Sequence, residues 1–368
     1  MDVIVIGGGI MGSVSALALA RRGARVLVLE RSVPGAEASS AAAGILGAQL
    51  EAHEPGEHAD LGLASRALWE RFAAQIVAAS GVDVGYRRCG ALVVRRDAAS
   101  LAAPLREAVF QREAGLVAPA LDASEVAALE PALAPMAGGV SFPDDGQVDP
   151  PRLLRALQIA VARAGATVRS GAQVRGVAVD GGRARGVVLE DGTTLPSDHV
   201  VLAAGSWSSL VAGVPLAPGD VRPVRGQIVE LSLRVPVLSR VVFGPGGYVV
   251  PRADGRVLVG STMEHVGFHK DVTAKAVRDL LVAATALVPA LEEASLTGTW
   301  SSFRPFAEKI LLGESAVRGL VLATGHHRNG ILLAPITGEI VAAAIEGKAY
   351  DVPRVTRSAQ AAQVAPAR

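Results

Sequence analysis

The hydrophobic pattern of the chain begins with two short apolar runs that lack polar alternation. Residues 2–6 (DVIVI) and 24–30 (ARVLVLE) are apolar at almost every inner position, which is typical of parallel strands that are buried on both faces. Residues 11–22 lie between them and have helical composition. The first thirty residues therefore predict a strand–helix–strand unit.

Apolar positions with helical spacing recur at four later places. The second of them is preceded by Asp149, a good N-cap residue, and by Pro150, which suits a first turn. A shorter capped helix is predicted within DASEVAALEP. The four longer helices are expected at residues 60–79, 152–164, 272–288 and 333–346.

Strand patterns fill the middle and the end of the chain. The segment VRGVAVDGGRARGVVLEDGTTLP predicts hairpins with turns at DGG and EDGT, and it leads into a buried strand at 199–203. RPVRGQIVEL, GYVVPR and GRVLVGST alternate like strands of an antiparallel sheet, whereas GLVLATG resembles another buried parallel strand.

This order of elements predicts an α/β protein in which a discontinuous Rossmann-like nucleotide-binding domain carries an inserted α+β substrate domain with an antiparallel sheet. The nucleotide-binding domain is expected at 1–85, 145–222 and 304–368, and the substrate domain at 86–144 and 223–303.

Composition narrows the possible partners. The net charge is +1 from 36 basic and 35 acidic residues, without a basic run interleaved with aromatic residues, so a nucleic-acid partner is not expected. One cysteine, Cys89, excludes an internal disulfide and favours a cytoplasmic location. Glycines interrupt the apolar N-terminus, which argues against a signal peptide or a membrane span. The histidines of HEPGEH are five residues apart across Pro55 and Gly56, so no metal site is predicted.

Candidate chemistry begins at GGGIMG, which follows the first strand directly. Gly7, Gly9 and Gly12 form a G-x-G-x-x-G turn between strand and helix, and Glu30 ends the second strand. In such a unit the glycines let the backbone approach a pyrophosphate at the helix N-terminus, and the acid accepts a hydrogen bond from a ribose hydroxyl. The turn therefore predicts a dinucleotide site.

The turn alone does not choose between NAD and FAD, although Glu30 disfavours the 2′-phosphate of NADP. The chain has one such turn, while nucleotide-domain patterns recur at VVLAAGSW and VLATGHHRNG. Distant segments of this kind suit an extended cofactor, which favours FAD.

Several segments together resemble one family of flavoproteins. GGGIMGSVSALALARRG, ASSAAAGILGA, DDGQVDPPRLLRAL, PVRGQIVEL, GYVVPRADGRVLVGSTME, FRP and GHHRNGILLAPITG are similar to segments of the D-amino-acid oxidase family. Within that family they look most like the glycine oxidases of thiamine biosynthesis. The resemblance extends from Met1 to about Gly347.

The resemblance implies a noncovalent FAD whose pyrophosphate lies on the glycine turn and whose adenosine ribose meets Glu30. Residues 41–46 would line the flavin, the backbone of Val174 would cover the adenine, and the turn at 325–330 would direct backbone N–H groups at the flavin. The remaining residues implied to hold the cofactor are Ser39, Ser40, Ala43, Gly44, Ile45, Leu46, Gly325, Arg328, Asn329, Gly330 and Ile331.

The resemblance also implies a substrate end. Arg304 in SSFRPF corresponds to an arginine that grips the substrate carboxylate, a role that suits the planar bidentate guanidinium. Tyr248 corresponds to a second carboxylate contact, and Met263 and Arg328 to positions near the substrate. When these residues hold the carboxylate of a substrate whose amine is neutral, its Cα–H can leave as hydride to flavin N5.

Two stretches depart from the family pattern. Relatives commonly have D-G-x-P-x-I-G soon after the clamp, where this chain has the shorter RPFAEKILLG. GPGGY before Tyr248 is unusually rich in glycine, which predicts a pocket wall with few side chains and room for a substrate larger than glycine.

These observations favour oxidation of a small amino acid or secondary amine, such as glycine, sarcosine or a D-amino acid, with O₂ reduced to H₂O₂. A dehydrogenase of D-amino or N-methyl amino acids that uses a quinone or protein acceptor is the alternative enzyme. A flavin-binding structural subunit of a complex is the alternative from another class. The resemblance further implies a homo-oligomer.

Overall fold

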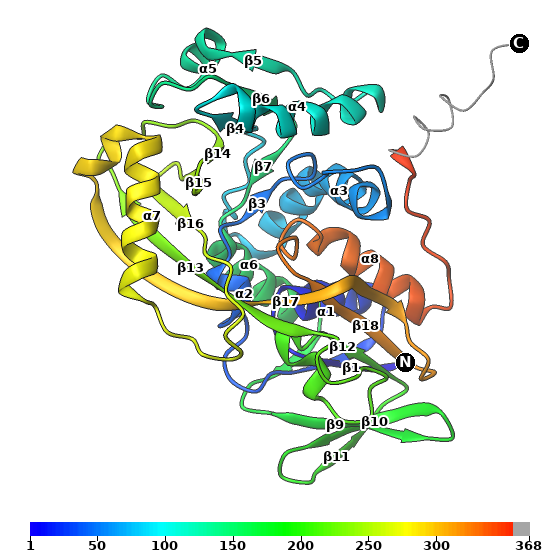
Figure 1. Ribbon diagram of the computed structural model, residues 1–368. Coiled ribbons are helices and arrows are strands. Elements are labelled where there is room, and N and C mark those ends of the chain that lie inside the picture. Colours follow the sequence, from blue (N-terminus) through cyan, green and yellow to red (C-terminus); the bar gives the residue numbers. More distant parts are fainter. Residues whose placement is uncertain (356–368) are drawn as a thin grey trace, which may run out of the picture.

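A computed structural model describes residues 1–355, so the end of the third expected nucleotide-domain segment, 356–368, lies outside the described residues. Its centre is a 13-stranded mixed sheet that runs through the whole molecule (Figure 1). The strands occur in the order β5-β6-β4-β14-β15-β16-β13-β17-β18-β12-β1-β2-β8.

One end of this sheet is parallel, as expected for a nucleotide-binding unit. It comprises β18 (Leu320–His326), β12 (His199–Leu202), β1 (Asp2–Ile6), β2 (Arg25–Leu29) and β8 (Thr167–Arg169). Ile6 at the end of β1 pairs in parallel with Leu202 and with Leu29. The four apolar residues 3–6 are all buried, which confirms the prediction of a strand covered on both faces.

The other end of the sheet is mainly antiparallel. It contains β13 (Arg222–Ser232), β14 (Val241–Gly244), β15 (Gly247–Pro251), β16 (Arg256–Gly260) and β17 (Ser295–Glu314), followed by β4 (Ala91–Arg95), β5 (Ala120–Asp122) and β6 (Gly138–Phe142). β14 and β4 form the parallel exception in this part.

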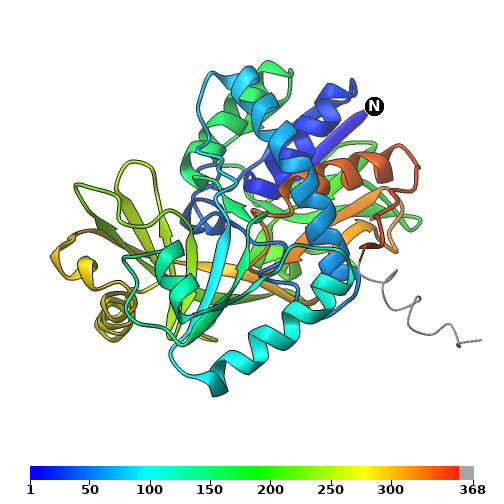
Figure 2. The same ribbon diagram turned by 90° about the horizontal axis from the view of Figure 1, so that it is seen from above.

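Helices cover both ends of the sheet. α1 (Ile10–Arg21), α3 (Glu57–Ser80), α6 (Pro150–Arg163) and α8 (Ala334–Ile345) pack together beside the parallel strands. α4 (Ala98–Glu113), α5 (Ala123–Leu129) and α7 (Ala274–Leu287) lie at the antiparallel end. In Figure 2 the blue and red-orange helices lie near the N-terminus, and the yellow α7 lies at the far side.

Two small sheets and three short helices complete the fold. β9 (Val174–Asp180), β10 (Arg183–Leu189) and β11 (Thr194–Pro196) form the expected hairpins, and β3 (Ile45–Leu46) pairs with β7 (Gly146–Gln147). The short helices are α2 (Ala38–Ala41), η1 (Gly205–Leu210) and η2 (Pro289–Glu293).

Local capping explains where several helices begin. The Asp149 side chain accepts a hydrogen bond from the backbone N–H of Arg152, with Pro150 in the first turn. In α5 the Asp122 side chain and the Glu125 side chain form a reciprocal capping box. These ends were readable from sequence because they depend on neighbours within three residues.

The mixed α/β fold is therefore confirmed, and one feature of it is unexpected. β17 is 20 residues long and runs across the expected domain boundary at 303/304 without a break. It pairs with β13 from Phe306 to Ser295 and then with β18 on its other edge. The two expected domains thus share one continuous sheet, and the exact division between them stays a prediction. None of the helices in residues 1–355 combines the length and apolar character that a membrane span requires.

Candidate active site

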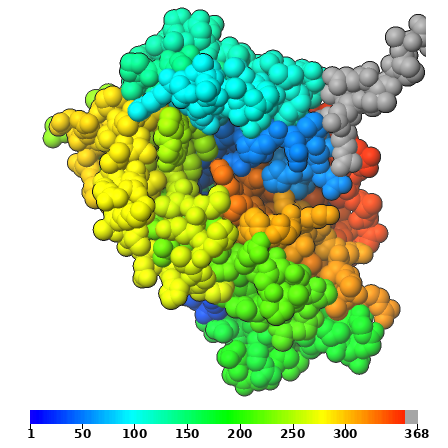
Figure 3. Space-filling view, viewed as in Figure 1, coloured from blue at the N-terminus to red at the C-terminus, as the bar shows by residue number. Residues whose placement is uncertain are grey.

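An elongated cavity of about 390 Å³ extends from the glycine turn after β1 to the side chains of Tyr248 and Arg304. Segments that are far apart in sequence line it: residues 6–11, 29–51, 172–175, 203–211, 226–261 and 302–331 each contribute. Figure 3 shows a face on which blue, yellow-green and orange segments meet around a hollow. The cavity thus joins the expected cofactor end to the expected substrate end.

The glycine turn leaves no room for side chains. Gly7 has a φ of +103°, and a Cβ there would lie 2.5 Å from the carbonyl oxygen of Ala203. A Cβ on Gly12 would lie 1.8 Å from the carbonyl oxygen of Gly7, so this glycine lets α1 pack against the end of β1. The empty turn and the helix N-terminus behind it form a cradle suited to a pyrophosphate.

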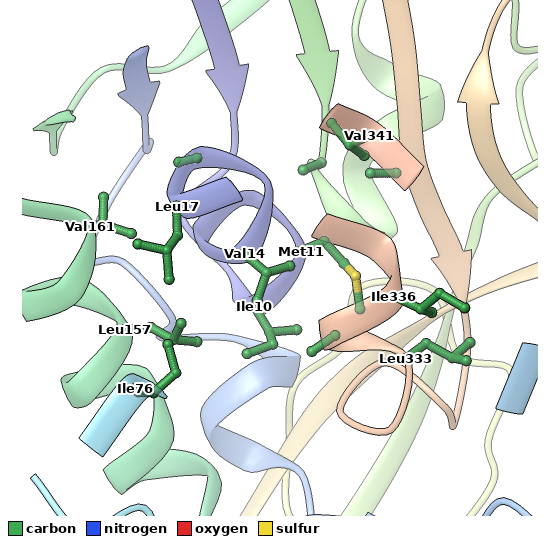
Figure 4. Close-up of a cluster of buried hydrophobic side chains, with 14 of the residues drawn as sticks. Ile10, Met11, Val14, Leu17, Ile76, Leu157, Val161, Leu333, Ile336 and Val341 are labelled. Atoms are coloured by element: carbon green, nitrogen blue, oxygen red, sulfur yellow. The ribbon is translucent and has the colours of Figure 1, made fainter. Parts of the chain in front are cut away.

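Apolar packing fixes the direction of α1. Its residues Ile10, Met11, Val14 and Leu17 belong to a buried cluster with side chains of α3, α6 and α8 (Figure 4). The helices on three sides hold the N-terminus of α1 at the mouth of the turn.

Two side chains order the backbone around this turn. The Glu30 carboxylate accepts hydrogen bonds from the backbone N–H groups of Gly8 (2.8 Å) and Ser32 (2.9 Å). The Ser39 hydroxyl accepts one from Ile10 N–H at 2.9 Å. Glu30 lines the cavity and each of its oxygens has a further lone pair, so a ribose hydroxyl can be added to these contacts.

Most of the residues implied to hold the cofactor line this one cavity. They are Gly7, Gly9, Glu30, Ser39, Ala43, Gly44, Ile45, Val174, Arg328, Asn329, Gly330 and Ile331. Four of the implied residues lie behind the cavity wall and do not line it: Gly12, Ser40, Leu46 and Gly325. Gly12, for example, packs against Gly7, which does line the cavity. The individual roles stay predictions.

Arg304 lies in β17 at the substrate end of the cavity. Its Nη1 donates to the carbonyl oxygen of Thr262 at 3.1 Å, and its Nη2 donates to the Ser261 hydroxyl at 2.6 Å. Burial lowers the pKa of Arg304, and the neighbouring Tyr248 hydroxyl opposes that change. An arginine remains charged in this setting. Among the described residues it has no ion-pair partner, so its charge is available to an anionic ligand.

Glycines make space for both presumed substrate contacts. A Cβ on Gly226 would lie 2.2 to 2.4 Å from the guanidinium atoms of Arg304. A Cβ on Gly260 would lie 2.5 Å from the hydroxyl oxygen of Tyr248. Both glycines belong to strands that neighbour each other in the sheet, β13 and β16.

Arg328 is already paired. Its Nη2 donates to the Glu51 carboxylate at 2.8 Å, and both residues line the cavity. The adjacent Asn329 side chain contacts the ring of His58 at 2.8 Å. Met263, by contrast, does not line the cavity, and its side chain is 52% exposed.

β18 ends at His326, His327 follows it directly, and both histidines line the cavity. His326 is buried, its Nε2 lies 3.1 Å from the Thr337 hydroxyl, and burial lowers its pKa to about 3. His327 packs edge-on against Phe306, and burial together with Arg304 and Arg328 lowers its pKa to about 4. Both rings are therefore neutral near pH 7, and neither carries the proton that a general acid would donate.

The unusual segment RPFAEKILLG, residues 304–313, forms the C-terminal half of β17. Phe306 pairs with His326, whereas the next pair joins Leu311 to Thr324, so the strand bulges between them. Just before the bulge, Phe306 packs against the ring of His327, which lines the cavity.

Sequence reasoning missed Glu51, Gly226, Gly260 and Ser261. Glu51 pairs with Arg328, which lies 277 positions further along the chain, so no local sequence pattern marks Glu51. The two glycines could have been noticed as glycines inside strands, which often mark a close approach.

Comparison with known proteins agrees with this geometry. Residues 2–344 match the family model described as DAO, FAD dependent oxidoreductase. The chain belongs to this family. Membership makes it an FAD-dependent amino acid oxidoreductase, and FAD is the cofactor that the glycine turn and the elongated cavity fit.

Individual DAO-family members are similar over almost the full chain. A glycine oxidase of Geobacillus kaustophilus is 37% identical over 360 residues, which cover 95% of each chain. A crystal structure of glycine oxidase from Geobacillus kaustophilus has a TM-score of 0.91 and 36% identity, covering 96% of each chain. The bifunctional protein ThiO/ThiG of Synechocystis is 37% identical over 92% of this chain and 51% of its own length.

Proposed function

We propose that this enzyme oxidises a small amino acid or secondary amine of the glycine, sarcosine and D-amino acid class to an imine, which water hydrolyses, and that O₂ is reduced to H₂O₂. The observation that carries the proposal is the partly buried guanidinium of Arg304. It lies at the end of the cofactor cavity, and within residues 1–355 it donates to the neutral oxygens of Ser261 and Thr262, beside the Tyr248 hydroxyl, and has no ion-pair partner. A substrate carboxylate is the counter-ion that such a group favours.

In this proposal the residues of the chain orient the substrate and do not transfer protons. Arg304 would grip the carboxylate with two parallel N–H donors, and the Tyr248 hydroxyl would donate to the same group. This grip fixes the rotation of the substrate about its carboxylate, so that its Cα–H bond faces the flavin end of the cavity. When bound, FAD supplies the two-electron acceptor for that bond.

The neutral histidines contribute to selectivity. His327 lines the cavity without a positive charge, so it does not compete with Arg304 for the substrate carboxylate. A neutral imidazole also leaves the substrate amine free of a repelling cation.

The activities named for the similar proteins support the finer proposals. Similarity to glycine oxidases supports the substrate class, and similarity to ThiO/ThiG supports a role in thiamine biosynthesis. A homo-oligomer and a cytoplasmic location remain part of the proposal, the latter because the chain has a single cysteine.

Anaerobic flavin reduction tests the proposal. The FAD-loaded protein is mixed with glycine, sarcosine and D- and L-amino acids, and the loss of oxidised flavin absorbance is followed. We expect bleaching by at least one small amine and a loss of about 100-fold or more in its rate at low substrate concentration in Arg304→Ala. Arg278→Ala, on the exposed face of α7, is the control.

Admission of air then distinguishes the acceptors. Rapid recovery of the oxidised spectrum with formation of H₂O₂ supports the oxidase. Slow recovery in air but fast recovery with a quinone would replace it by the dehydrogenase. Bleaching that persists unchanged in Arg304→Ala would contradict the carboxylate clamp.

A further inference from the structure

Arg252 is a buried cation that the proposed reaction does not use. It follows β15 directly, and its side chain is 6% exposed. Its Nη2 donates to the carbonyl oxygen of Ala43 at 2.7 Å, and its Nη1 donates to the side-chain oxygen of Gln147. Gln147 is itself held, because its amide donates to the carbonyl oxygen of Pro251 at 2.8 Å.

In the described part of the chain, residues 1–355, the charge of Arg252 has no direct counter-ion. Both of its acceptors are neutral, and no group among these residues accepts a hydrogen bond from its Nε. Burial lowers the pKa of Arg252 to about 10, with Asp149, Asp254, Arg256 and Cys89 as the other groups that act on it. Of these, Asp149 and Asp254 are already bonded to Arg256. Burying an arginine whose hydrogen-bond acceptors are neutral costs folding free energy, so we expect this residue to serve a function that offsets the cost.

The carbonyl that Arg252 holds belongs to a peptide of the cavity wall. Ala43 and Gly44 both line the cavity, and the peptide bond between them is trans. In a trans peptide the N–H points away from the C=O. With the Ala43 carbonyl bonded to Arg252, the N–H of Gly44 therefore faces the opposite side.

That N–H has no partner in the part of the chain that the structure describes. The backbone beyond it is also fixed, because the carbonyl oxygen of Gly44 accepts a hydrogen bond from Val148 N–H at 2.9 Å. Gly44 has a φ of +76°, and a Cβ there would lie 2.0 Å from the carbonyl oxygen of Val148. A buried N–H without a protein partner is expected to donate to a ligand or to water.

We propose that Arg252 is a positioning residue for the cofactor: through the Ala43 carbonyl it orients the Ala43–Gly44 peptide so that the Gly44 N–H donates to the bound flavin. The proposal rests on FAD binding and is independent of which amine is oxidised. A donor aimed at a flavin stabilises the electron-rich reduced form more than the oxidised form. Arg252 therefore tunes the flavin potential without touching substrate.

The test compares Arg252→Met and Arg252→Lys with the wild type as FAD holoenzymes. The readouts are the dissociation constant of FAD and the two-electron midpoint potential, measured by equilibration with a reference dye. We expect Arg252→Met to bind reduced flavin about tenfold more weakly relative to oxidised flavin, which lowers the potential by about 30 mV. Arg252→Lys keeps the charge but loses the two planar N–H donors. Its midpoint potential should therefore lie between those of the wild type and Arg252→Met.

Arg240→Met is the matched control, because Arg240 also donates to a backbone carbonyl, but that carbonyl belongs to Leu129, which does not line the cavity. It should lose thermal stability and keep the wild-type potential. A folded Arg252→Met with wild-type potential and FAD affinity would overturn the proposal. If that variant does not fold, Arg252→Lys decides: an unchanged potential then overturns it. Loss of activity without a potential change in either variant counts against it as well.

Discussion

Gly226 lies against the guanidinium of Arg304, so closely that a Cβ on the glycine would be 2.2 Å from Nη2 and 2.3 Å from Nη1. The two residues belong to the paired strands β13 and β17, in which Gly226 is opposite Ser302. The orientation of the presumed carboxylate clamp therefore depends on a missing side chain in the neighbouring strand.

Gly226→Ala should weaken substrate binding without unfolding the protein. The added methyl displaces a flexible side-chain end rather than backbone, so Arg304 rotates and loses its alignment. We expect KM for the best amine to rise about tenfold, equivalent to about 1.4 kcal/mol, with FAD binding unchanged. Steady-state kinetics and FAD titration measure the two effects.

Gly298→Ala is the control for this change, because its Cβ would have its nearest neighbour, the Trp300 ring, at an ordinary 3.4 Å. An unchanged KM in Gly226→Ala would mean that the guanidinium is not the carboxylate contact.

Gly12→Ala should act at the opposite end of the cavity. Its Cβ would lie 1.8 Å from the Gly7 carbonyl oxygen, so α1 has to move away from the turn. Overpacking of this kind costs about 1–3 kcal/mol, and FAD affinity should fall at least tenfold. Thermal unfolding and FAD titration report the two losses. Gly62→Ala in α3, whose Cβ would have its nearest neighbour at 3.6 Å, should leave FAD affinity intact.

Glu51→Gln should change which substrates are accepted. Removing the carboxylate frees the Arg328 guanidinium, which then faces the cavity without its ion-pair partner. For an amine with a second carboxylate, such as iminodiacetate, KM should fall about fivefold, equivalent to about 1 kcal/mol. KM for glycine should change less. Equal changes for both amines would contradict this role. Glu308→Gln, which breaks an exposed pair with Arg222, is the control.

The buried His326 predicts a loss of stability in acid. Its folded pKa is about 3, below the ordinary value of 6.5. The unfolded chain therefore binds a proton that the folded chain excludes, and stability decreases as the pH falls from 6.5 toward 3. The slope is about 1.4 kcal/mol per pH unit for this group. Urea unfolding of His326→Gln between pH 7 and pH 5 should show a shallower decrease than the wild type.

Local patterns were sufficient for much of the fold. The strand–helix–strand unit, the cap at Asp149 and the hairpins depend on neighbouring residues, and all were predicted. α4 was missed because Pro104 interrupts it and its apolar positions form no clear stripe, although Asp97 caps it through Ser100 N–H at 2.8 Å. The length of β17 was missed because its partners change from β13 to β18 along the strand.

A motif marked Gly7 and a resemblance marked Arg304, and both residues line the cavity, while their roles stay predictions. The contacts that tune it join residues far apart in sequence, such as Glu51 with Arg328 and Ala43 with Arg252. Such pairs leave no local signature, since either partner alone resembles an ordinary surface or core residue.

The uninterrupted course of β17 has a mechanical consequence. One strand carries Arg304 and, further along, forms the ladder with β18 that ends at His326 beside the cavity. The separation between Arg304 and the turn after β18 is therefore held by a ladder of backbone hydrogen bonds rather than by a loop between domains. We expect this spacing to limit the length of the molecule that can lie between Arg304 and the flavin.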